Sequence, residues 1–141
     1  MKNSTGFLGI IKKSGKLAVG DETVAAEAQT KRARLILTAS DAGEYTMRRA
    51  KSLSESKGIP HIHLEETKET LGLVSGRATA AIAAICDMGM AASFAAKLNA
   101  ETGQFNEIEA ELTAKAERFA RRKKIKEDRK NPKTGKRRQN I

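Results

Sequence analysis

Residues 35–64 read LILTASDAGEYTMRRAKSLSESKGIPHIHL, in which two apolar runs flank a long and mostly polar stretch. The first run, residues 35–37, holds only Leu and Ile and is typical of a buried strand. Residues 59–64 return to a strand pattern after a loop marked by Pro60. Because strands that are separated by a helix must be covered on both faces, this part of the chain decides the fold class.

The polar stretch between the two runs has the marks of a helix. Ser40 and Asp41 are residue types that cap helix starts, and Lys57 with Gly58 is typical of a helix end. We therefore expect a helix that Ser40 and Asp41 cap and that ends at Lys57 and Gly58.

The alternation of strands and helices continues on both sides of this segment. We expect further helices around residues 7–11, 21–31, 67–71 and 88–98, and strands over residues 16–19 and 80–86. Strands spaced by helices favour an α/β fold, a three-layer α/β/α sandwich in which helices cover both faces of a sheet.

The net charge of the chain lies at its C-terminal end. All ten net positive charges arise from residues 115–141, which hold thirteen Lys or Arg and three acidic residues, whereas residues 1–114 sum to zero. Because clustered cations attract phosphate whatever its sequence, nucleic acid is the first partner to consider.

A separate helix is predicted between the body and this basic end. Asn106 and Glu109 have the spacing of a capping box, and an apolar stripe at helical spacing follows. The stripe consists of Phe105, Ile108, Leu112, Ala116 and Phe119. It is expected to dock on the body, with binding to a partner helix as the alternative. We expect three parts, namely a body over residues 1–100, an amphipathic to basic helix over 101–128 and a flexible basic tail over 129–141.

Several kinds of site are excluded by composition. The single Cys86 permits no intramolecular disulfide and is expected to be buried and inert. His61 and His63 share one face of a strand but have no third ligand, so we expect no metal and no cofactor. No phosphate-binding Walker loop, nucleophile elbow or paired Cys and His occurs, so we expect neither an enzyme nor a small-molecule substrate. No run approaches the roughly 20 apolar residues of a membrane span, so we expect a soluble, cytoplasmic protein without a membrane partner.

Six short segments of the body occur in an order and spacing known from one family. They are Gly6 to Glu22, Lys31 to Leu37, Asp41-Ala42 with Thr46, Gly58-Ile59-Pro60, Leu71-Gly72 with Gly76-Arg77, and Asp87 with Gly89 and Ala91. Together they resemble the bacterial YlxQ-type proteins, small members of the ribosomal L-seven-Ae and L-thirty-e superfamily. The resemblance covers about residues 6–98 and does not extend to Phe105 and beyond.

The resemblance implies an α/β/α fold with a small mixed sheet that binds structured RNA. The typical target is a kink-turn, a helix-internal loop flanked by sheared G·A pairs. It further implies a ribosomal or ribosome-associated protein whose partner is ribosomal RNA or the ribosome. The alternative function is a protein-interaction adaptor that uses the C-terminal amphipathic helix.

In the family, the loop that opens the second helix lies against the G·A pairs, and its positions match Gly20, Asp21, Glu22 and Thr23. A guanine edge presents N–H donors, so Glu22 is expected to accept from it and Thr23 to bond a sugar or phosphate. Helix starts also prefer acids and small hydroxyls for their own stability, so an acidic cap without a ligand is the alternative interpretation.

The chain departs from the archaeal form of this pattern at one cation. Where that pattern has Asn, Glu and then Lys, this chain has Glu22, Thr23 and Ala26, so one phosphate contact is missing. Either cations at neighbouring positions replace it, or the target is not a kink-turn. The candidate cations are Lys16, Lys31, Arg32 and Arg34.

Two further loops are expected to border the RNA. One holds Ser40 and Asp41, for which a helix cap is the alternative role, and the other holds Arg77, which is either a phosphate contact or a solvated charge. The basic end is expected to add phosphate contacts from Arg121, Arg122, Lys123, Lys124, Lys136, Arg137 and Arg138.

Overall fold

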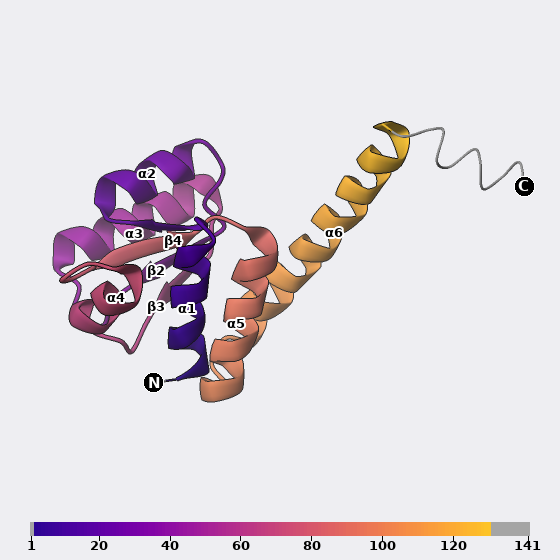
Figure 1. Cartoon of the computed structure of the whole chain (residues 1–141). Helices are drawn as coiled ribbons and strands as arrows, with labels where there is room; N and C mark the ends of the chain where they lie inside the picture. The colour runs from indigo at the N-terminus through magenta and orange to yellow at the C-terminus, as the bar shows by residue number, and fades with distance from the viewer. Residues whose placement is uncertain (1, 131–141) are drawn as a thin grey trace, which may run out of the picture.

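The computed structural model describes residues 2–130, within which six helices surround a four-stranded sheet. The helices are α1 (Asn3–Lys13), α2 (Asp21–Gln29), α3 (Glu44–Lys57), α4 (Lys68–Ser75), α5 (Met88–Thr102) and α6 (Asn106–Lys130). The strands are β1 (Leu17–Val19), β2 (Leu35–Thr38), β3 (His61–His63) and β4 (Ile82–Ile85). Figure 1 shows helices on both faces of the sheet and α6 extending away from the body. The predicted three-layer α/β/α fold is confirmed.

The sheet is small and mixed, with the strand order β1-β4-β2-β3. β2 and β3 are parallel, whereas β4 is antiparallel to both of its neighbours. Val19 and Leu37 both lie opposite Ala83, near the start of β4. Leu17 and Leu35 both lie opposite Ile85, its last residue. The two ends of β4 therefore mark the two ends of the sheet.

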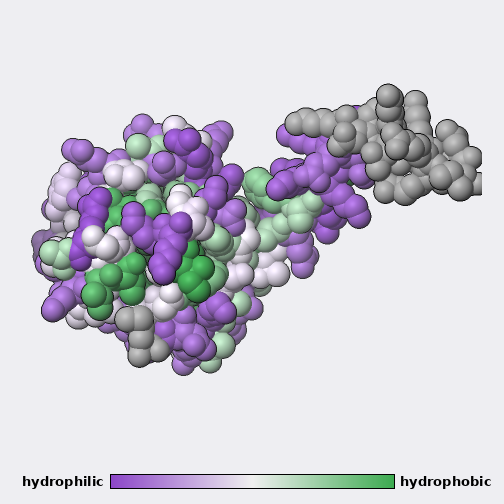
Figure 2. Space-filling model, in the orientation of Figure 1, coloured by the Kyte–Doolittle hydropathy of each residue, from purple (hydrophilic) through white to green (hydrophobic). Residues whose placement is uncertain are grey.

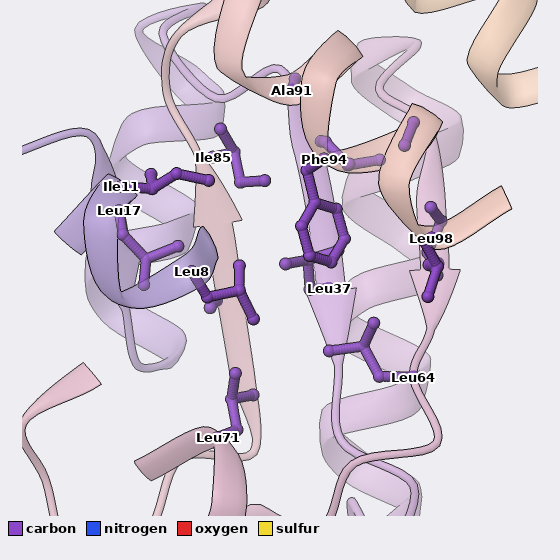
Figure 3. Packing of buried hydrophobic residues seen from close by; sticks show 14 of the residues in the cluster. Leu8, Ile11, Leu17, Leu37, Leu64, Leu71, Ile85, Ala91, Phe94 and Leu98 are labelled. Carbon is purple, nitrogen blue, oxygen red and sulfur yellow. The ribbon is translucent and has the colours of Figure 1, made fainter. Parts of the chain in front are cut away.

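Successive strand residues point to opposite faces and build two apolar layers. Leu35, Leu37 and Ile85 pack against residues of α1, α4, α5 and α6 on one face. Figure 3 shows this layer, in which Phe94 and Leu98 of α5 lie over the sheet. On the other face Ile36 and Ala84 pack against α2 and α3. Because the central strands are buried on both faces, they read as continuous apolar runs in the sequence.

The C-terminal stripe docks on the body, as expected. Leu112 is fully buried in the same core as the sheet, and Phe105, Ile108 and Ala116 are partly buried against it. Phe119 lies at the margin of the contact and is 41% exposed. α6 then continues to Lys130, so the first two residues of the expected tail over 129–141 are helical, and the rest of that tail lies outside the described residues.

The predicted capping box at Asn106 and Glu109 is wrong. Asn106 is the first residue of α6, and its side-chain oxygen accepts a hydrogen bond from Nδ2 of Asn99 at 2.7 Å. The same Nδ2 donates to Oε1 of Glu109 at 2.8 Å, and the backbone N–H of Phe105 donates to Oδ1 of Asn99 at 2.9 Å. One amide of α5 therefore replaces the local cap and joins the two helices.

The third helix is also capped differently from the prediction. α3 begins at Glu44, and its N-cap is Gly43 without a side-chain hydrogen bond. Asp41 instead accepts from the backbone N–H of Lys68, the first residue of α4, at 2.7 Å. Because Asp41 and Lys68 are far apart in the chain, local spacing favoured the wrong helix. The loop after β2 is thereby fixed to α4.

Candidate nucleic-acid interface

Gly20 makes the turn from β1 into α2 and places the start of that helix at the end of the sheet. Its φ of +97° is one that only glycine adopts without strain. Its N–H donates to the carbonyl of Ile82 at 3.0 Å, and its own carbonyl accepts from Val24 at 2.9 Å. A Cβ at position 20 would lie 3.3 Å from Nη1 of Arg77, so the Arg77 guanidinium lies directly beside the start of α2.

The residues that lead into β4 hold three separate segments at this end of the sheet. The N–H of Ala80 donates to the carbonyl of Lys68 at 2.9 Å, and the carbonyl of Ala81 accepts from Ala39 at the same distance. Ile82 binds Gly20 as described above. We name the resulting surface the Gly20 edge, which consists of Gly20, Asp21, Glu22, Thr23, Ser40, Asp41, Lys68 and Arg77.

Arg77 owes its position to a close approach between α4 and the loop that follows it. The N–H of Arg77 donates to the carbonyl of Gly72 at 2.8 Å, after Gly76 ends α4 with a φ of +77°. A Cβ at position 72 would lie 2.7 Å from Cα of Thr79, which real structures do not allow. Gly72 is therefore required where it is, and the Gly72 and Gly76-Arg77 pattern has a physical cause.

The exposed groups of the Gly20 edge suit a polar ligand that carries both donors and negative charge. The first N–H groups of α2 have no partner within the helix, and its dipole favours an anion there. Glu22 and Thr23 are exposed acceptors within the first turn of α2, and Arg77 adds an exposed cation. Asp21 is half-buried, and within residues 2–130 its buried Oδ1 has no hydrogen-bond partner. The arrangement can accept hydrogen bonds from the N–H groups of bases and can bind a phosphate.

The cations expected to replace the missing Lys lie at the opposite end of the sheet. The carbonyl of Lys16 accepts from Cys86, and the N–H of Arg34 donates to Ile85, both at 2.7 Å. Lys16 and Gly20 are four residue steps apart along β1, which is about 13 Å. The predicted site residues therefore form two groups. Gly20, Asp21, Glu22, Ser40, Asp41 and Arg77 lie at one end, and Lys16, Lys31, Arg32 and Arg34 lie at the other, whereas Thr23 lines a surface pocket together with Lys16 and Arg32.

The opposite end contains residues that sequence reasoning missed. Arg34 lies over the ring of Phe119, with its guanidinium carbon 4.7 Å from the ring centroid. Lys57 of α3 and Lys115 and Arg118 of α6 line the same groove as Arg34. The only local signal was the position of Lys115 and Arg118 beside the apolar stripe. Lys68 of the Gly20 edge was also missed, because its contact with Asp41 is tertiary.

The basic part of α6 lies beyond the body. Arg121, Arg122, Lys123 and Lys124 are all exposed, and Figure 2 shows hydrophilic side chains along the projecting helix. Lys136, Arg137 and Arg138 lie outside the described residues.

His61, His63 and Cys86 lie in the sheet or directly after it and have neighbours within the protein. Thr38 Oγ1 lies 2.8 Å from Nε2 of His61 and 3.1 Å from Nδ1 of His63, and burial lowers the pKa of His61. Cys86 is half-buried, not buried as predicted, and burial raises the pKa of its thiol. In the part of the chain that the structure describes, no three His, Cys, Asp or Glu side chains gather as a metal site. In that same part, every helix is too short or too polar to cross a membrane.

The fold is similar to the folds of known proteins. A protein of unknown function from Bacillus halodurans has a similar structure, with a TM-score of 0.66 and 23% identity over 70% of this chain and 99% of its own. A 15.5kD RNA binding protein from Giardia lamblia has a TM-score of 0.57 and 18% identity over 68% of this chain and 84% of its own. No curated protein matches the chain. Residues 3–94 match one family along nearly the whole body, and the chain belongs to the ribosomal protein L7Ae/L30e/S12e/Gadd45 family.

Proposed function

We propose that this protein is a non-catalytic RNA-binding protein that recognises structured RNA with the Gly20 edge. Membership of the family supports the proposal, and the structurally similar Giardia lamblia protein is an RNA binding protein. The observation that carries it is the position of the Arg77 guanidinium beside Gly20 at the start of α2. This position puts a cation next to the first turn of α2, where helix N–H groups lack partners within the helix and where Glu22 lies.

The target that fits this edge is a kink-turn-like internal loop, with ribosomal RNA as its source. A sharply bent internal loop exposes guanine edges and crowds its phosphates, so its reader needs acceptors and a cation within a small area. Glu22 is the proposed acceptor, Thr23 the proposed sugar or phosphate contact, and Arg77 the proposed phosphate contact. Residues 1–100 form the proposed RNA-binding unit, and residues 101–128 and 129–141 add phosphate contacts that do not depend on sequence.

An adaptor function of the C-terminal helix has less support. Its apolar stripe is used within the chain, because Leu112 is fully buried and three further stripe residues are partly buried against the body. Phe119 and Ile125 are the large apolar side chains of α6 that stay exposed among the described residues.

Binding of the full-length protein to two RNAs tests the proposal. One RNA carries a kink-turn, and the other is a straight duplex of the same base composition. Arg77→Gln and Glu22→Gln each remove a charged hydrogen-bonding group, worth about 1.5–3 kcal/mol where the bond forms. Each is expected to lower the preference for the kink-turn by about tenfold or more. Lys13→Gln and Glu55→Gln are controls, because each removes an exposed charge of the same sign elsewhere.

Binding to the same two RNAs also shows which results would overturn the proposal. A wild-type protein that binds the kink-turn and the straight duplex equally, or variants that behave like their controls, would contradict recognition by the Gly20 edge.

A further inference from the structure

We propose that the opposite end of the sheet binds the phosphate backbone of a second RNA segment, in a groove between the body and α6. The proposal rests on the proposed function in that both involve RNA, but it concerns other residues and another kind of contact. It assigns to this protein the ability to hold two RNA segments at once, one at each end of the sheet.

The groove has a volume of about 610 Å³ and is lined from both sides. Lys31, Arg34 and Lys57 belong to the body, and Lys115 and Arg118 belong to α6. None of the described residues that line it is acidic. We name this surface the Arg34 groove. Five cations around one concave surface focus positive potential into it, which is the electrostatic condition for binding a polyanion.

The wall that α6 contributes is fixed to the body. Leu112 is buried in the main core one turn before Lys115. Arg34 stacks over Phe119 one residue beyond Arg118. The backbone segments that carry the cations of both walls are therefore held relative to each other, so the groove does not have to be assembled when a ligand binds.

Most of these cations have no carboxylate partner in the protein. Lys115 pairs with Glu111 at 3.1 Å, an exposed pair that contributes little. For the other four, no ion pair forms within residues 2–130. Like charges gathered in this way repel one another, and a bound anion relieves the repulsion. The groove thus has unpaired positive charge between two walls that are packed together.

The positive surface continues from the groove along α6. Lys115, Arg118, Arg122, Lys126 and Arg129 follow at steps of three and four residues, which places them on one face of the helix. Arg122, Lys126 and Arg129 are exposed on the part of α6 that leaves the body (Figure 1). The row extends for about 21 Å. A row of that length exceeds the size of a small anion and fits a chain of phosphates.

The groove and the Gly20 edge make separate contacts with RNA. About 13 Å of strand and the bulk of the body separate the two surfaces. The groove presents five cations and, among its described lining residues, no carboxylate, so it suits a backbone more than base edges. We therefore assign to it the backbone of an RNA duplex, independent of sequence.

A salt series with the straight duplex tests the assignment on the full-length protein. The variant Lys57→Gln with Arg118→Gln removes one cation from each wall. It is expected to lower affinity for the duplex and to reduce the slope of log affinity against log salt by about 1.4 to 1.8, which corresponds to two phosphate contacts. Lys13→Gln with Lys97→Gln removes the same charge from exposed positions on α1 and α5 and is expected to leave the slope nearly unchanged. Urea unfolding of both variants checks that the fold is retained.

The outcomes separate this proposal from the proposed function. Arg77→Gln should change the affinity for the duplex, and the salt slope of that affinity, by no more than the loss of one phosphate contact would. If the groove variant has the slope of its control, the second RNA surface does not exist. If a polyglutamate chain binds the wild type and not the groove variant, while duplex binding is the same in both, the groove is a site for acidic protein and the proposal is wrong. If the groove variant loses duplex binding although the wild type does not prefer a kink-turn, the groove stands and the proposed function of the Gly20 edge fails.

Discussion

The two ends of the sheet differ in what they offer a ligand. The Gly20 edge combines free helix N–H groups, the acceptors Glu22 and Thr23, and the single guanidinium of Arg77 beside Gly20. The Arg34 groove offers five cations and, among its described lining residues, no acid. Donors and acceptors in fixed places discriminate between ligands, whereas cations alone attract any phosphate. In the two proposals, one end therefore selects an RNA and the other binds a phosphate backbone.

The difference between the ends follows from how each is built. Backbone hydrogen bonds from the residues that lead into β4 hold the Gly20 edge, and the required glycines lie in the body. The Arg34 groove exists only because α6 packs on the body through Leu112. The first surface lies within the part that matches the family, and one wall of the second lies outside it.

The largest expected effect concerns the anchor of α6. Leu112→Ala removes a fully buried side chain and is expected to lower the free energy of unfolding by about 2–5 kcal/mol, as measured by urea denaturation. It should also lower the affinity for the duplex, because it loosens one wall of the Arg34 groove. The preference for the kink-turn should change less. Ile125→Ala changes a residue of the same helix that is 51% exposed and should change stability by less than about 0.5 kcal/mol. Equal effects of the two substitutions would mean that α6 does not share the core.

A smaller effect is expected at the other end of the sheet. Gly72→Ala forces a Cβ against the Thr79 backbone and should cost about 1–3 kcal/mol in thermal or urea unfolding. Because the same contact positions Arg77, selectivity for the kink-turn should fall while duplex affinity is kept. Gly6→Ala is the matched control, since nothing lies within 4 Å of a Cβ there and alanine favours a helix by up to about 1 kcal/mol. If Gly72→Ala is as well tolerated as Gly6→Ala, the account of how Arg77 is placed is wrong.

The stacking of Arg34 on Phe119 should contribute less. Phe119→Leu keeps an apolar side chain but removes the ring, and a partly exposed cation–π contact is worth about 0.5–1 kcal/mol. A double-mutant cycle with Arg34→Met measures the coupling energy between the two side chains. A coupling near zero would mean that the stacking does not hold the groove together.

The smallest expected effect is a pH dependence of stability that arises from His61 within the sheet and not from the two surfaces at its ends. Burial, together with the charges of His63 and Lys51, lowers the pKa of His61 below its usual 6.5. The unfolded chain therefore takes up the proton first, so stability is full above about pH 6.5 and falls as the pH is lowered through that value. Urea midpoints at about pH 7.5 and about pH 5.5 measure the loss, and His61→Gln should reduce it.

The exposed His63 provides the control, because His63→Gln should keep most of the pH dependence. A pH dependence that His61→Gln leaves unchanged would exclude His61 as its source.

Local patterns predicted much of the fold. The apolar runs of the central strands, buried on both faces, and the acids and hydroxyl at the start of α2 identified those elements. The periodic stripe also predicted that the C-terminal helix docks on the body. These predictions succeeded because hydrophobic period and the preference of helix starts for acids are properties of residues that are neighbours in the sequence.

Predictions that depended on distant partners failed or were incomplete. Asp41 was assigned to α3, but its partner Lys68 is 27 positions away. Asn106 was taken as a local cap, but Asn99 of the preceding helix binds it. In both cases a hydrogen bond to another element replaced the local one, and only the packing of the elements decides which forms.

The sequence by itself determined that a neutral α/β body carries a strongly basic end, because composition and hydrophobic period are properties of the chain alone. The tertiary structure decided which residues act together. It separated Lys16, Lys31, Arg32 and Arg34 from Gly20 by the length of a strand and brought Arg77 to Gly20 and Arg34 to Phe119. Those associations come from strand register and from the docking of helices, which depend on contacts between distant parts of the chain.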